Sequence, residues 1–229
     1  LQVDGAITGS STINGVGINV IETGSILISN DGGTGTISSA VRNTGLGFEV
    51  FDDLTTGDDN TSIGRKALTK LTTGGGNTAV GSGSLTAHTT GDSNTAFGVS
   101  SLAANTTASN NTAVGSSALA ANTTGASNTA VGSLSLDACT TGNSNVAVGI
   151  NSLTSTQTGS NSVAVGNGAL SSQLGSGNMF NVAIGPDAGA AITTGTNNVA
   201  IGALALDANT TANDNTAVGA DALSANTTG

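Results

Sequence analysis

The chain has 229 residues, of which 14 are acidic and 4 are basic, so its net charge is −10. This balance argues against nucleic-acid binding, because phosphate contacts need Lys and Arg, and against adhesion to anionic membranes. No apolar run reaches the ~20 residues that a membrane-spanning helix needs, and the lone Cys139 excludes a disulfide framework.

Residues 1–42 differ in pattern from the rest of the chain. Apolar residues alternate with polar ones in two short stretches, at Val16, Ile18 and Val20 and then at Ile26 and Ile28. The pattern predicts two strands around a turn, followed by a glycine-rich loop at 31–35. Because the open end of a stacked β-structure invites further pairing, we interpret residues 1–42 as an N-terminal β cap or neck.

Residues 43–229 form a repeat array with a period of 17 residues, interrupted by one 19-residue step. The period is marked by a recurring glycine, at Gly47, Gly64, Gly81, Gly98, Gly115, Gly132, Gly149, Gly166, Gly185, Gly202 and Gly219. Self-similarity at a fixed short interval indicates structural units that bury their apolar faces by stacking on one another.

Two apolar columns accompany the glycine. A β-branched or bulky residue precedes it, such as Val80, Phe97 or Val114, and a leucine usually stands four residues after it, such as Leu85 or Leu102. We expect both columns to point inward, as the two walls of a thin core. The Leu column has one exception, Gly189.

An asparagine column indicates parallel stacking. Its members are Asn43, Asn60, Asn77, Asn94, Asn111, Asn128, Asn145, Asn181, Asn198 and Asn215, with Ser162 as the one substitute. Parallel β-coils rise ~4.8 Å per turn, so stacked amides can bond along the axis as a structural ladder. Helical repeats need about twice this length. The sequence therefore predicts an all-β protein, a parallel β-solenoid of about eleven coils.

The few charged residues give one expected ion pair and one candidate metal site. Asp53 and Lys70 occupy the same column in adjacent coils, which predicts an ion pair. Asp52, Asp53, Asp58 and Asp59 form the acidic cluster at the entry to the array, and calcium favours such carboxylates. Solvated turns are also commonly acidic, so we expect no bound metal and no cofactor, with this cluster as the only calcium candidate.

The sequence does not indicate an enzyme. His88 and Cys139 are the only residues of their types, and they share one repeat column three coils apart, too far for shared metal coordination or catalysis. We interpret both as ordinary variation at a tolerant position.

The array is expected to self-associate. One Val and one Leu in each coil make a thin core for the number of residues that must be ordered. Columns of Ala and Ser offer a face on which coils of other chains can meet. We therefore predict a homotrimer.

Some segments resemble known fibres. Ser160–Gly166 (Ser-Asn-Ser-Val-Ala-Val-Gly) and Asn197–Gly202 (Asn-Asn-Val-Ala-Ile-Gly) resemble the head repeat of trimeric autotransporter adhesins, a left-handed parallel β-roll with a unit nearer 14 residues. The longer unit, Asn-Thr-Ala-Val-Gly-x-x-Ala-Leu-x-x-Asn-Thr-Thr-Gly, is more similar to repeat arrays of phage tail fibres. The resemblance covers about residues 43–229. It implies a trimeric, extracellular, attachment-related protein and carries over no catalytic residue.

The expected function is that of a structural shaft segment in a trimeric attachment fibre, a phage or phage-like tail fibre on the virion. Such a shaft projects a tip that binds a host cell-surface receptor through regions outside this segment. No Trp or Tyr is present to form a glycan platform, which favours shaft over tip. The alternative is the head of a bacterial surface adhesin that itself binds host matrix or another surface.

Overall fold

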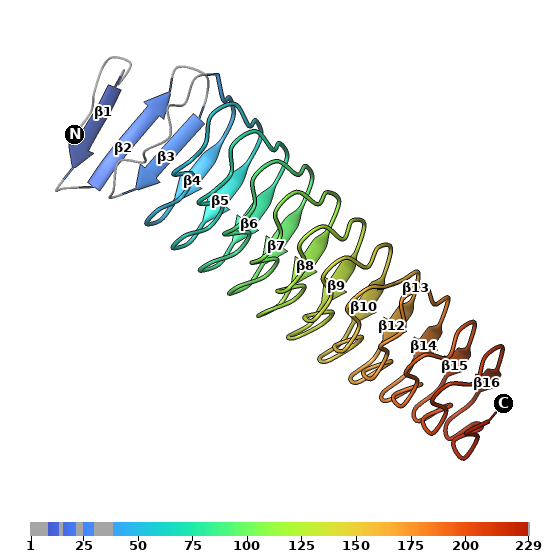
Figure 1. Cartoon of the computed structure of the whole chain (residues 1–229). Coiled ribbons are helices and arrows are strands. Elements are labelled where there is room, and N and C mark those ends of the chain that lie inside the picture. The colour runs from blue at the N-terminus through green and yellow to red at the C-terminus, as the bar shows by residue number, and fades with distance from the viewer. Residues whose placement is uncertain (1–8, 14–15, 22–24, 30–38, 229) are drawn as a thin grey trace.

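The computed structural model describes residues 9–13, 16–21, 25–29 and 39–228, with side-chain burial from residue 39 onward. In this part of the chain short strands stack along one axis as a rod, with the N-terminal strands at one end and the C-terminus at the other (Figure 1). The described residues form strands and turns and no helix, and so they contain no long apolar helix that could span a membrane.

The rod begins with three longer strands, β1 (Gly9–Ile13), β2 (Val16–Ile21) and β3 (Ser25–Ser29). β1 pairs with β2 and β2 with β3 in antiparallel fashion, whereas β3 pairs with β4 in parallel. The two strands predicted at 16–20 and 26–28 are thus confirmed. The predicted loop at 31–35 lies outside the described residues. That this region acts as a cap or neck stays a prediction.

Beyond β3, each turn of the chain adds one three-residue parallel strand to the same 14-stranded sheet. These strands are β4 (Thr44–Leu46), β5 (Thr61–Ile63), β6 (Thr78–Val80), β7 (Thr95–Phe97), β8 (Thr112–Val114), β9 (Thr129–Val131), β10 (Val146–Val148), β12 (Val163–Val165), β14 (Val182–Ile184), β15 (Val199–Ile201) and β16 (Thr216–Val218). Every strand residue lies beside its equivalent one period later, as Ala113 lies beside Ala130. The predicted parallel β-solenoid is confirmed, with ten turns separating the eleven strands.

The 19-residue turn between β12 and β14 keeps this register and loops out its extra residues. Within it, β13 (Gly177–Asn178) forms a separate two-stranded parallel sheet with β11 (Gly159–Ser160) in the turn before. Met179 is only 1% exposed and packs against Gly159 and Gly175. The insertion therefore has its own apolar anchor and does not disturb the neighbouring turns.

The expected inward orientation of the residue before the glycine is wrong. In the strands the middle residue, such as Ala113 or Ala130, is fully buried, while Val114 and Val131 face outward and are partly exposed. The reason is volume. The opposite wall already supplies a leucine in most turns, and turns stacked at strand spacing leave room for only a methyl group beside it.

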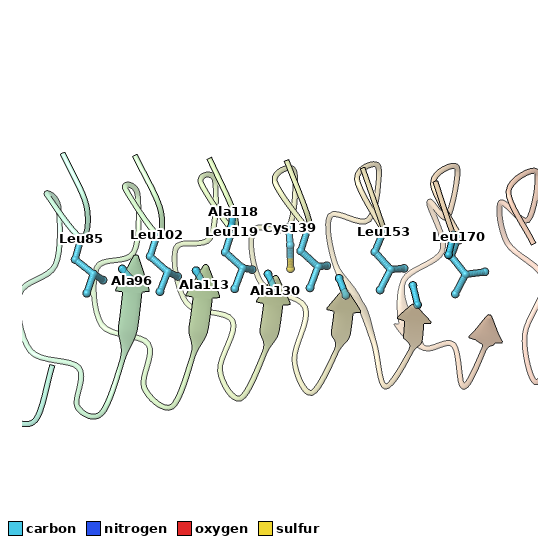
Figure 2. Packing of buried hydrophobic residues seen from close by; sticks show 14 of the residues in the cluster. Leu85, Ala96, Leu102, Ala113, Ala118, Leu119, Ala130, Cys139, Leu153 and Leu170 are labelled. Atoms are coloured by element: carbon cyan, nitrogen blue, oxygen red, sulfur yellow. The ribbon is translucent and has the colours of Figure 1, made fainter. Parts of the chain in front are cut away.

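From Leu68 to Leu206 the leucine column is buried as predicted, whereas Leu223 in the last turn is 49% exposed; the backbone conformation of the column is unusual. Leu85, Leu102, Leu119, Leu153 and Leu170 point across the coil toward the alanine column (Figure 2). Leu119 has a φ of 51°, in the left-handed region, and its equivalents are similar. That conformation costs an L-residue about 1–2 kcal/mol, while burial of a leucine contributes about 1.5–3 kcal/mol, so burial offsets the strain.

The exception in that column is compensated by its neighbours. At Gly189 a Cβ atom would come within 2.9 Å of Ile192 Cδ1 and 3.0 Å of Leu170 Cδ2. Ile192, three residues later, is fully buried. The isoleucine and the leucine of the preceding turn therefore fill the space that the absent leucine leaves.

The recurring glycine is required where each strand ends. Gly115 has a φ of 138°, which side chains avoid, and a Cβ there would approach the carbonyl oxygen of Gly132 to 2.4 Å. The glycines of successive turns meet in this way along the rod. A backbone atom of the next turn occupies the place where a side chain would begin.

We expect Gly115→Ala to destabilise the rod by at least about 1–3 kcal/mol, the cost of a residue in a disallowed backbone region, with the steric clash in addition. Urea unfolding followed by circular dichroism measures the loss. Ser116→Ala, at the exposed neighbouring residue, is the control and should change stability by less than about 0.5 kcal/mol. Equal midpoints for the two variants would contradict the contact.

Candidate functional site

The asparagine ladder runs inside the rod as predicted. The side-chain oxygen of one asparagine accepts a hydrogen bond from the backbone N–H of the residue one turn later, at 2.8–3.1 Å. The members joined in this way are Asn43, Asn60, Asn77, Asn94, Asn111, Asn128, Asn145 and Ser162, and then Asn181, Asn198 and Asn215.

Each ladder amide also holds the turn that closes its own coil. The Nδ2 atom of Asn128 donates to the carbonyl oxygen of Gly142 at 2.8 Å, and its equivalents do the same at 2.7–2.9 Å. One side chain thus bonds along the axis and across the coil. Because these groups are buried, each bond satisfies a donor or an acceptor that water cannot reach.

Ser162 interrupts the ladder, and Gln173 repairs it. A serine hydroxyl is too short to reach the next turn as an amide does. The Oε1 atom of Gln173 accepts from Asn181 Nδ2 at 3.0 Å, and its Nε2 atom donates to Ser162 Oγ at 3.1 Å. The glutamine comes from the column that holds asparagine in other turns, such as Asn122. The two unusual residues therefore act as a pair.

A second series of bonds runs along the turns. In one column the hydroxyl groups of seven threonines each donate to the carbonyl oxygen one turn later, at 3.0–3.2 Å; they are Thr55, Thr72, Thr89, Thr106, Thr123, Thr140 and Thr193. These hydroxyls are thus engaged within the rod. The threonine that follows each of them, such as Thr124, is exposed.

The acidic cluster at the entry to the array is not gathered into a metal site. Asp58 Oδ1 accepts from the backbone N–H of Val41 at 2.8 Å, and Asp59 accepts from Arg42 Nη2 at 2.7 Å. Hydrogen bonding to Arg42 holds the pKa of Asp59 below its usual value. Among the described residues no three His, Cys, Asp or Glu side chains come together as metal ligands, and Asp52 and Asp53 form no such group with Asp58 and Asp59.

The ion pair expected between Asp53 and Lys70 is not formed. The ion pairs found from residue 39 onward join Arg42 to Asp59, and Lys66 Nζ to Glu49 Oε2 at 3.0 Å. Each pair still connects adjacent turns in one column. Stacking thus brings charges of one column close enough to pair, but the spacing alone did not show in which columns the side chains point toward each other.

His88 and Cys139 share one column, as expected. The structure adds that this column faces inward, and both side chains are fully buried. Burial raises the pKa of the Cys139 thiol to about 11, so this thiol stays protonated at neutral pH. Its Sγ atom lies 3.7 Å from the carbonyl oxygen of Gly142. Among the described residues, neither joins a group of three or more His, Cys, Asp or Glu side chains that could hold a metal ion.

The surface feature that sequence reasoning missed is an outer apolar stripe. It consists of the last residue of each parallel strand: Leu46, Ile63, Val80, Phe97, Val114, Val131, Val148, Val165, Ile184, Ile201 and Val218. Phe97 is 56% exposed and Ile184 41%. Val99 and Ile150 extend the stripe around the following glycine. The eleven parallel strands, β4 to β16 without β11 and β13, contain no charged residue.

The insertion exposes a smaller apolar pair. Leu174 and Phe180 flank the looped-out residues and are each more than half exposed.

Comparison of the chain with protein-family models, curated proteins and solved structures found no match.

We expect Asn128→Ala to cost about 2–5 kcal/mol of stability. The change leaves the N–H of Asn145 buried without a partner, at about 1–3 kcal/mol, and it leaves the buried carbonyl of Gly142 with only the weak thiol donor of Cys139, at a comparable cost. Urea unfolding checks it. Thr124→Ala, on the exposed side of the same turn, should remain within about 0.5 kcal/mol of the parent chain. A mild effect at Asn128 would mean that the ladder contributes little.

We also expect calcium to leave the rod's stability unchanged, because Asp58 and Asp59 already serve Val41 and Arg42. Thermal melts in about 1 mM calcium, a concentration that fills weak extracellular sites, and in chelator should coincide. A higher melting temperature with calcium, lost in Asp58→Asn, would show that the carboxylates rearrange around the ion.

Proposed function

We propose that this chain is a shaft segment of a homotrimeric attachment fibre, a phage or phage-like tail fibre outside the cell. The observation that carries the proposal is the outer apolar stripe. Monomeric soluble proteins seldom expose long continuous apolar surface, and such surface commonly marks an interface.

A second copy of the same chain is the partner that fits the stripe. Its side chains recur at the strand spacing, so a partner must present contacts at the same axial spacing, which another copy does by construction. The strand face is also uncharged, so copies with a net charge of −10 can approach there with the least repulsion. Cyclic symmetry brings identical stripes together around one axis. The number three comes from the resemblance to trimeric fibres.

The solenoid gives such an assembly its mechanical role. Each turn bonds to its neighbours through strand pairing, the asparagine ladder and threonine hydroxyls. A stack of this kind bends little. It can hold a receptor-binding region of the fibre, outside this segment, away from the particle.

Light scattering of the chain should give a mass about three times its 21.7 kDa. Phe97→Asp places a charge in the stripe and should lower the mass toward that of one chain. Thr107→Asp, on an exposed turn of the same coil, should leave the assembly intact. Circular dichroism tells whether the separated chains keep their β-structure.

A cross-linking experiment covers the case in which the separated chain unfolds. In a Cys139→Ser background, Val114→Cys should give oxidised inter-chain dimers, and Thr124→Cys should give none. An unmodified chain that is monomeric, with no cross-link at Val114, would reject the trimer.

Cell binding separates the shaft from the adhesin head. A fluorescently labelled rod should show no saturable binding to bacterial or host cells if it is a shaft. Saturable binding to host matrix would support the adhesin head. The trimer is tested separately, by the mass measurement.

A further inference from the structure

His88 is the one titratable ring in the core of the described rod. It is fully buried, in the column that holds Asn105 and Asn122 in the next two turns. Its Nε2 atom lies 2.8 Å from the carbonyl oxygen of Gly91. Because a carbonyl only accepts, Nε2 carries a proton. The Nδ1 atom is buried and has no hydrogen-bond partner, and a second proton there would bury an unpaired charge, so the folded ring is neutral.

The neutral ring copies an asparagine contact. In the equivalent place Asn122 Nδ2 donates to the carbonyl oxygen of Gly125 at 2.9 Å. The ring also lies against its glycine so closely that a Cβ atom at Gly91 would approach His88 Cε1 to 2.6 Å. Histidine thus takes the place of asparagine in this column as a donor, through Nε2.

The surrounding charges do not compensate a protonated ring. In the turn before, residues 61–77 carry Arg65, Lys66 and Lys70 and no acidic residue, while residues 95–111 in the turn after carry no charge. Asp92, in the same turn as His88, is exposed and is the carboxylate that acts on the ring. Burial lowers the pKa of His88 from its ordinary 6.5, against smaller opposing effects of the Gly91 carbonyl, the Asp92 charge and the Asn105 backbone.

We propose that His88 makes its coil, residues 78–94, an acid-sensitive opening point of the rod: protonation of the buried ring drives this coil out of the stack. The open coil binds a proton at Nδ1 more readily than the closed coil. Stability is therefore complete above the ordinary pKa of about 6.5, falls as the pH drops below it, and levels off below the lowered pKa of the folded state.

Hydrogen exchange of the full chain between pH 7.5 and 5, corrected for intrinsic rates, tests the proposal. Amides near His88, such as those of Ala87 and Thr89, should open up to about tenfold more often for each pH unit below 6.5. Amides three turns away, near Cys139, should not respond.

His88→Asn supplies the matched control, since asparagine is the residue that this column already uses. The variant should fold, keep the bond to the Gly91 carbonyl and lose the acid response. Asn122→His should transfer the response to the turn around Gly125. A uniform loss of protection along the rod in both the parent and His88→Asn would overturn the proposal. The loss would then come from protonation of carboxylates and not of His88.

A second readout is independent of stability. Ring NMR of the folded chain should show His88 as the Nε2–H tautomer, titrating below pH 6.5. A ring that titrates at its ordinary pKa without loss of the folded signals would also overturn the proposal.

Discussion

Close axial contact between backbones sets the geometry of the whole rod. At each glycine of the repeat from Gly47 to Gly202, a glycine carbonyl of the next turn lies where a Cβ atom would otherwise begin, as that of Gly132 does over Gly115. This contact holds neighbouring turns at strand spacing and forces every other residue into vertical columns. The contacts of a side chain therefore come mainly from the equivalent residues in the turns above and below it. The amide ladder, the threonine hydroxyl bonds and the thin leucine–alanine core all follow from that spacing.

The core is small because stacking, and not volume, does most of the stabilising. Most turns contribute one leucine and one or two alanines to it, and buried asparagines fill positions that larger domains would give to aliphatic residues. Buried amides are costly alone, but here the next turn supplies each partner. Because the core has no room for larger side chains, the valines and isoleucines of the strands lie on the outer face. That surplus of apolar surface is why we favour an assembly of copies over a single rod.

The period alone was enough to predict the parallel solenoid, the amide ladder and the buried leucines, because all three depend on vertical repetition. The prediction that the residue before each glycine points inward is wrong, although the sequence contained the information needed to avoid it. Asn111 and Ala113 are two residues apart, so a buried asparagine places the alanine on the same inner face and Val114 outside. The rule that bulky residues face inward was given precedence over this alternation.

Other features could not be read from single columns. The left-handed conformation of Leu119 contradicts ordinary preference and is explained only by the wall it faces. Ion pairing depends on the directions of the side chains at the turns, so Lys66 pairs with Glu49 whereas Lys70 does not pair with Asp53. Gln173 has no distinguishing sequence pattern, because its role depends on its contacts with Ser162 and Asn181.

That glutamine contact bears on how such a gene can lengthen or shorten. Where successive turns are equivalent, recombination between repeats that adds or deletes one unit leaves every vertical partner in place. A crossover between Ser162 and Gln173 would separate a short side chain from the long one that completes it. It would also leave Asn181 Nδ2 with the Gly195 carbonyl as an acceptor but without the Gln173 amide oxygen. This stretch should therefore be inherited as a block, and it gives an otherwise uniform array a fixed internal landmark.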